Sequence, residues 1–182
     1  MALQGKLHHP KRFITTHNDK GEAVIDTSLP EDAPFYPIPG GAGFAQAYVT
    51  KGFPTQLNDG ADMAVYKQYL DSAPGLTVSD GTVLRYVDIP PASLSPMHRT
   101  VSLDYGVVLD GEVELILDSG ETRVLQKGDV CIQRATMHAW RNLSDTEWAR
   151  MLYILQPAQP LQVVGKEFKE DLADMQGVRS ST

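Results

Sequence analysis

Short apolar runs separated by turn-forming residues dominate the second half of the chain. Each run is rich in β-branched, aromatic or aliphatic residues, and Pro-Pro, Asp-Gly or Lys-Gly-Asp steps stand between them. The candidate strands are residues 82–89, 105–109, 113–117, 122–125, 130–132, 139–141 and 148–155. Strands this short and this closely spaced, with no helix between them, predict an all-β sandwich or barrel.

The first half of the chain has a different pattern. Residues 12–15 and 23–25 are short β-like runs, and Asn18-Asp19-Lys20-Gly21 between them predicts a hairpin turn. A Pro/Gly loop follows over 34–43, and then a strand over 44–50. Because a lone hairpin exposes two edges, we expect it to pair with the barrel or with a second subunit.

Two segments carry helical spacing. Residues 62–71 place apolar side chains near helical intervals, and a loop with anchoring aromatics is the alternative interpretation. Residues 166–175 are charged and amphipathic, which predicts a short C-terminal helix. The expected organisation is an N-terminal arm with packing strands (1–75), a barrel (76–165) and a C-terminal helix or tail (166–182), together forming one structural domain.

Composition narrows the classes of partner. The chain has 182 residues, a formal charge of −7 and 42% hydrophobic residues, so neither nucleic acid nor an anionic membrane surface is an expected partner. No stretch reaches the roughly 20 apolar residues that a membrane span needs. The single cysteine, Cys131, fits a reducing compartment, and we expect a cytoplasmic protein.

The stretch 96–111 holds the strongest candidates for chemistry. It contains His98 and Asp104 and ends in an apolar run that Asp110-Gly111 stops. A histidine and an aspartate at even separation on an extended strand point to the same side of a sheet. We therefore expect both side chains inside the barrel.

These residues resemble the first sequence motif of the cupin superfamily, His-x-His followed by an acidic residue and a glycine. The corresponding positions are His98, Thr100, Asp104 and Gly111, and Ala92 stands where the pattern has an earlier glycine. A second motif is matched at the positions Gly128, Gln133, Ala135, His138 and Asn142, with one residue missing after the first of these.

The resemblance implies a double-stranded β-helix, or jelly-roll barrel, like that of small one-domain cupins from bacteria and fungal secondary-metabolite clusters. In metal-binding cupins these motifs supply imidazoles and a carboxylate to a transition metal. Here His98, Asp104 and His138 would be the ligands of Fe, Mn or Zn in a metal-dependent oxidoreductase. Thr100 replaces the middle histidine of that set.

A metal-free alternative uses the same three residues as acid, base and orienting group of a dehydratase, cyclase or isomerase. A third alternative is a non-catalytic cupin that binds a small molecule. For each we expect substrate contacts from Thr100, Tyr86, Trp140 and Arg99. We expect a homodimer because the N-terminal hairpin has little core of its own.

Overall fold

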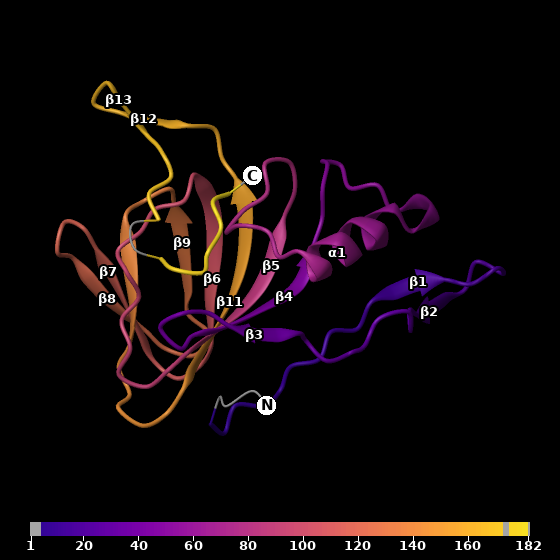
Figure 1. The fold of residues 1–182 in the computed structure, drawn as a ribbon, viewed down its shortest axis with the longest axis horizontal. Coiled ribbons are helices and arrows are strands. Elements are labelled where there is room, and N and C mark those ends of the chain that lie inside the picture. The colour runs from indigo at the N-terminus through magenta and orange to yellow at the C-terminus, as the bar shows by residue number, and fades with distance from the viewer. Residues whose placement is uncertain (1–4, 173–174, 182) are drawn as a thin grey trace.

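Two antiparallel sheets form the barrel in the computed structural model, which describes residues 5–172 and 175–181. The larger sheet has the strand order β3-β4-β5-β11-β6-β9, and the smaller has the order β10-β7-β8 (Figure 1). The strands of the larger sheet are β3 (Phe35–Pro37), β4 (Gly43–Val49), β5 (Val83–Ile89), β6 (Ser102–Asp110), β9 (Val130–Arg134) and β11 (Ala149–Pro157). Those of the smaller sheet are β7 (Val113–Leu117), β8 (Thr122–Leu125) and β10 (His138–Asn142).

Burial alternates along β6, as expected for a strand with one face inside the barrel. Ser102, Asp104, Gly106 and Val108 are buried, and the residues between them are only partly buried. One apolar cluster joins the two sheets around Val108, Val113, Trp140 and Met151. The predicted β architecture is confirmed, and every strand expected after residue 80 is present within a few residues of its expected bounds.

One α-helix of the described residues packs on this framework. The helix α1 (Ala61–Asp71) follows a 3-10 turn, η1 (Asn58–Gly60), and it decides the two interpretations of 62–71 in favour of a helix. Tyr66 is fully buried and donates a hydrogen bond from its hydroxyl to the carbonyl oxygen of Gln46 on β4, at 2.7 Å. Among the described residues, no helix is long and apolar enough to cross a membrane.

The N-terminal hairpin is present but stands apart from the barrel. Among the described strands, β1 (Thr15–His17) and β2 (Ala23–Ile25) pair only with each other, and all their residues are exposed. Figure 1 shows this ribbon extending away from the barrel. The turn at 18–21 is confirmed, since the Asn18 carboxamide oxygen accepts hydrogen bonds from the backbone N–H groups of Lys20 and Glu22. Pairing with a second subunit stays a prediction, which light scattering can test.

The C-terminal prediction is wrong in the described residues. Instead of a helix over 166–175, the chain forms a hairpin of β12 (Leu161–Val163) and β13 (Lys166–Phe168). Val164 and Gly165 make the turn with positive φ values of 49° and 73°, which a helix excludes. Residues 173–174 of the predicted helix lie outside the described residues.

The loop prediction for 34–43 is also wrong in part, because β3 forms within it. Pro37 is tolerated there because β3 is an edge strand, paired on one side with β4.

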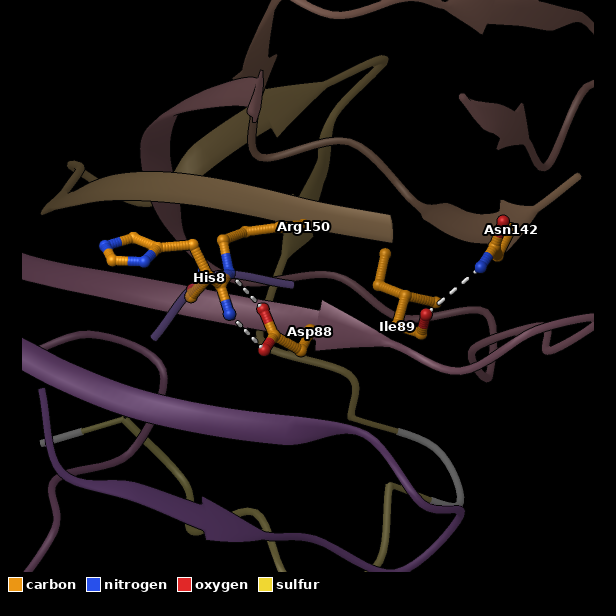
Figure 2. A network of polar contacts seen from close by, with 5 residues as sticks. All are labelled: His8, Asp88, Ile89, Asn142 and Arg150. Carbon is orange, nitrogen blue, oxygen red and sulfur yellow. Dashed lines mark hydrogen bonds and ion pairs between the residues drawn. The ribbon is translucent and has the colours of Figure 1, made fainter. Parts of the chain in front are cut away.

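Buried polar bonds fasten the strand ends to one another (Figure 2). Asp88 on β5 accepts two hydrogen bonds from the Arg150 guanidinium on β11, from Nε to Oδ1 and from Nη2 to Oδ2, both at 2.6 Å. Arg150 also donates from Nη1 to the carbonyl oxygen of His8, which holds the N-terminal segment against the barrel. On β10, the Asn142 side chain donates to the carbonyl oxygens of Ile89, Pro90 and Glu147.

Candidate functional site

The barrel contains a cavity of about 150 Å³. Most of its wall is apolar, and a few polar side chains converge in it from different strands. The apolar lining includes Ile38, Phe44, Leu76, Val87, Ile89, Leu94, Trp140, Leu155 and Met175. The polar and ionisable lining consists of Arg85, Ser93, Ser95, His98, Thr100, Asp104, His138 and Tyr153. An apolar cavity with few polar groups is the usual form of a small-molecule site.

Two histidine rings lie side by side in this cavity, tilted by 48°. His98 and His138 form an isolated antiparallel bridge, in which each backbone N–H donates to the other's carbonyl oxygen at 2.9 Å. Their ring centroids are 4.3 Å apart. His98 lies ahead of β6, which begins at Ser102, so its orientation comes from this bridge and not from a continuous strand with Asp104. Both His98 and Asp104 nonetheless reach the cavity, as expected from the sequence.

The main chain fixes how each imidazole is presented. His98 Nδ1 lies 2.9 Å from the carbonyl oxygen of Pro96, and His138 Nδ1 lies 3.0 Å from that of Thr136. A carbonyl oxygen can only accept, so we assign the proton of each neutral ring to Nδ1. The Nε2 lone pair of each ring is thereby left as an acceptor.

Burial keeps both rings neutral. It lowers the pKa of His98, although the Pro96 carbonyl opposes the shift. Burial together with the neighbouring His98 ring lowers the pKa of His138 to about 3. At neutral pH the site therefore offers two uncharged imidazoles, able to accept a hydrogen bond or a proton.

Asp104 is the buried acid of the cavity. Burial raises its pKa to about 6, and the nearby hydroxyl groups of Ser102 and Thr100 and the charge of Arg85 oppose that shift. The Ser102 hydroxyl donates to Thr100 Oγ1 at 2.6 Å, and Thr100 Oγ1 lies 3.4 Å from Asp104 Oδ2. Asp104 Oδ1 is buried and has no hydrogen-bond partner among the described residues. Thr100, where the family pattern has a histidine, thus supports the carboxyl group.

The metal site expected from the family resemblance is not formed by these side chains. In the part of the chain that the structure describes, no three His, Cys, Asp or Glu side chains are grouped so as to hold a metal ion. Asp104 has a shorter side chain than the glutamate of the pattern, and its Oδ2 is turned toward Thr100. Two imidazoles without a third protein ligand fall short of the usual catalytic metal set.

The residues expected to contact substrate divide into two groups. Thr100 and Trp140 line the cavity, and the Trp140 ring packs edge-on against His138 with centroids 5.9 Å apart. Tyr86 and Arg99 do not line it. Tyr86 faces the other side of β5, against Phe35 and Arg150. Arg99 stacks over Phe168 and donates from Nε to the carbonyl oxygen of Lys169, so it fastens the C-terminal hairpin.

Arg85 and Tyr153 are cavity residues that the sequence interpretation missed. Arg85 is buried and lies at the same strand parity as the buried Val83, whereas Tyr86 has the opposite parity. The signal in the sequence was an arginine at an inward position of an apolar strand. Tyr153 pairs with Arg85 in the register of β11 with β5. It lies outside both sequence motifs, so no motif pointed to it.

Gly106 makes room for the Tyr153 ring. A Cβ at this position would lie 3.0 Å from Tyr153 Cε1 and 3.4 Å from Met151 Cε. We expect Gly106→Ala to lower the free energy of unfolding by about 1–2 kcal/mol through overpacking, as measured by urea denaturation. In a Tyr153→Leu background the same change should cost less, and an equal cost in both backgrounds would contradict the contact.

Comparison with known proteins agrees with this geometry. The Cupin domain model of the Cupin_2 family matches residues 85–155, which include both histidines and Asp104. The chain is 47% identical over 161 residues to "Phomopsin biosynthesis cluster protein C'" of Diaporthe leptostromiformis, covering 88% of this chain and 85% of that one. The chain belongs to the cupin family.

Other relatives carry names of two kinds. "Oryzines biosynthesis cluster protein J" of Aspergillus oryzae is 42% identical, covering 90% of this chain and 92% of that one. "Cupin-domain-containing oxidoreductase virC" of Hypocrea virens is 38% identical, covering 90% of this chain and 84% of that one. These relatives support a cupin of secondary metabolism.

Proposed function

We propose that this cupin is an enzyme of secondary metabolism that acts on a small organic molecule inside its barrel by acid–base chemistry. The reaction class is dehydration, cyclisation or isomerisation. The observation that carries the proposal is the pair of neutral imidazoles, His98 and His138, whose Nε2 atoms remain as acceptors in an apolar cavity that also holds Asp104.

Each residue has a role in this proposal. His98 is the base, since only burial lowers its pKa, whereas the neighbouring ring lowers that of His138 further. In a dehydration, His98 Nε2 takes a proton from a carbon next to a carbonyl group. The carboxyl group of Asp104 gives its proton to the leaving hydroxyl, which departs as water, and a carbon–carbon double bond forms. His138 accepts a hydrogen bond from the substrate and orients it.

The test follows hydrogen exchange. Small β-hydroxy ketones and aldehydes are incubated with the protein in D₂O, and NMR records exchange next to the carbonyl group. We expect exchange with the wild type, its loss in His98→Ala, and no change in the control His17→Gln, which alters an exposed residue of β1. Binding of these compounds without exchange or turnover would leave a non-catalytic binding cupin and overturn the proposal.

A metal-dependent oxidoreductase is the second candidate, and the name of the Hypocrea virens relative favours it. Elemental analysis of protein purified without chelator separates the two. A stoichiometric transition metal that is lost in His98→Ala, together with an activity that needs it, would replace the acid–base proposal by this one.

A further inference from the structure

Arg85 is held rigidly in the cavity wall. Its Nε donates to Gln46 Oε1 and its Nη2 to the carbonyl oxygen of Gly75, both at 2.7 Å. Its guanidinium carbon lies 5.1 Å from the centre of the Phe44 ring. Arg85 is 2% exposed, so a fixed positive charge lies in the wall of a mostly apolar cavity.

No carboxylate neutralises this charge by direct contact. Among the described residues, the ion pairs do not include Arg85. Burial lowers the pKa of Arg85 to about 10, so the guanidinium stays protonated at neutral pH. Asp104 stabilises this charge electrostatically without forming an ion pair with it. A buried cation with no carboxylate in contact is costly for a fold, and a ligand oxygen can supply the missing acceptor.

Asp104, on the same inner face, has a buried oxygen atom that lacks a hydrogen-bond donor among the described residues. Register places Arg85 opposite Tyr153 on β11, and Tyr153 opposite Gly106 on β6. Asp104 lies two residues before Gly106, so β11 alone separates the strands that carry these two side chains. Asp104 Oδ1 is buried without a partner. The wall thus presents the Arg85 guanidinium and an unpartnered carboxyl oxygen, one strand apart.

We infer that the substrate is a β-hydroxy carbonyl compound whose carbonyl oxygen accepts from Arg85 and whose hydroxyl group pairs with Asp104 Oδ1. This inference rests on the proposed acid–base function and names its substrate class. An acceptor oxygen and a hydroxyl group separated by a short carbon chain would satisfy both unpartnered groups at once. The apolar lining then surrounds the hydrocarbon part of the molecule.

Arg85 gains a catalytic role from this placement. When His98 takes the proton from the carbon between the two functional groups, the electron pair of that C–H bond moves onto the carbonyl oxygen as an enolate. The Arg85 guanidinium, fixed in advance by Gln46 and Gly75, stabilises that developing charge. When the enolate collapses, the bond to the hydroxyl group breaks and Asp104 protonates the departing oxygen.

Ligand binding tests the inference separately from turnover. The probes are diacetone alcohol, which has both groups, and methyl isobutyl ketone, which is the same molecule without the hydroxyl group. Dissociation constants are measured by NMR titration of the full chain. We expect the wild type to bind diacetone alcohol more tightly than the ketone, by about tenfold for one hydrogen bond to the buried Asp104 carboxyl group.

Two variants assign the contacts. Asp104→Leu should weaken diacetone alcohol about tenfold and leave the ketone unchanged, whereas Arg85→Gln should weaken both. The control Arg134→Gln, at an exposed position on β9, should bind both probes as the wild type does. If Arg85→Gln does not fold, the Asp104→Leu comparison decides alone. Equal binding of the two probes to the wild type, or equal losses for both in Asp104→Leu, overturns the inference.

The proposed substrate class and the proposed acid–base function can fail separately. Loss of hydrogen exchange in His98→Ala, with probe binding insensitive to Asp104→Leu, would keep the acid–base proposal and reject the β-hydroxy carbonyl substrate. Probe binding that follows the expected pattern without any hydrogen exchange would keep the assigned contacts and reject catalysis.

Discussion

Asp88→Ala is expected to lower the free energy of unfolding by about 3–5 kcal/mol, because it leaves the Arg150 guanidinium buried without its anion. Asp88 is fully buried, and it accepts both of its short hydrogen bonds from Arg150. The pair ties β5 to β11, the two central strands of the larger sheet, close to the cavity wall. Urea denaturation followed by circular dichroism measures the change.

Two further variants make this result specific. Glu147→Gln breaks the exposed ion pair with Lys6, and we expect no measurable change in the unfolding midpoint. The double variant Asp88→Leu with Arg150→Met removes both charges and should recover part of the loss. A loss below about 1 kcal/mol in Asp88→Ala would contradict a structural role for the pair.

The second large effect is a dependence of stability on pH that His138 causes. Its pKa falls from 6.5 in the unfolded chain to about 3 in the folded one, so below pH 6.5 only the unfolded chain binds the proton readily. Stability is therefore lost as the pH falls. From this residue alone, the free energy of unfolding should be about 3 kcal/mol lower near pH 4 than near pH 7.5.

Comparison of variants isolates this contribution. His98, whose pKa is also lowered, adds a loss of the same sign. Asp104 opposes both, because its pKa is raised from 3.8 to about 6 and the folded chain takes up its proton first.

The measurement is the difference in unfolding free energy between wild type and His138→Gln at the two pH values. That difference should change by about 3 kcal/mol, and a pH-independent difference would show that His138 titrates normally. His17→Gln is the matched exposed control.

Strand alternation explains why most of the barrel could be predicted from the sequence. Short β-rich runs such as β6 and β7 are separated by turn residues such as Asp110 and Gly111, which mark the strand ends. The helix prediction at the C-terminus failed because amphipathic spacing over a few residues does not distinguish a helix from a hairpin. There the positive φ of Val164 and Gly165 decided the structure.

The motifs locate the site, but they do not identify all the residues that line it. His98, Asp104 and His138 fall where the family pattern places them, and all three line the cavity. Tyr86 is predicted to contact substrate because it lies near the first motif in sequence, whereas strand parity relative to Val83 places Arg85 inward instead. Whether the three site residues could surround a metal depends on side-chain directions, which spacing along the chain does not contain.

Two alanines stand where the family pattern has glycine and have the main-chain conformation that glycine adopts most easily. Ala92 and Ala135 occupy positions where the family pattern has glycine, and their φ values are 53° and 50°, in the left-handed region that glycine adopts most easily. An L-residue there costs about 1–2 kcal/mol. The residue type differs from the family pattern at both positions, but the main chain has the left-handed conformation typical of glycine. A search for such barrels by residue identity would therefore score this chain too low at both positions, whereas a search by main-chain conformation would count them as matches.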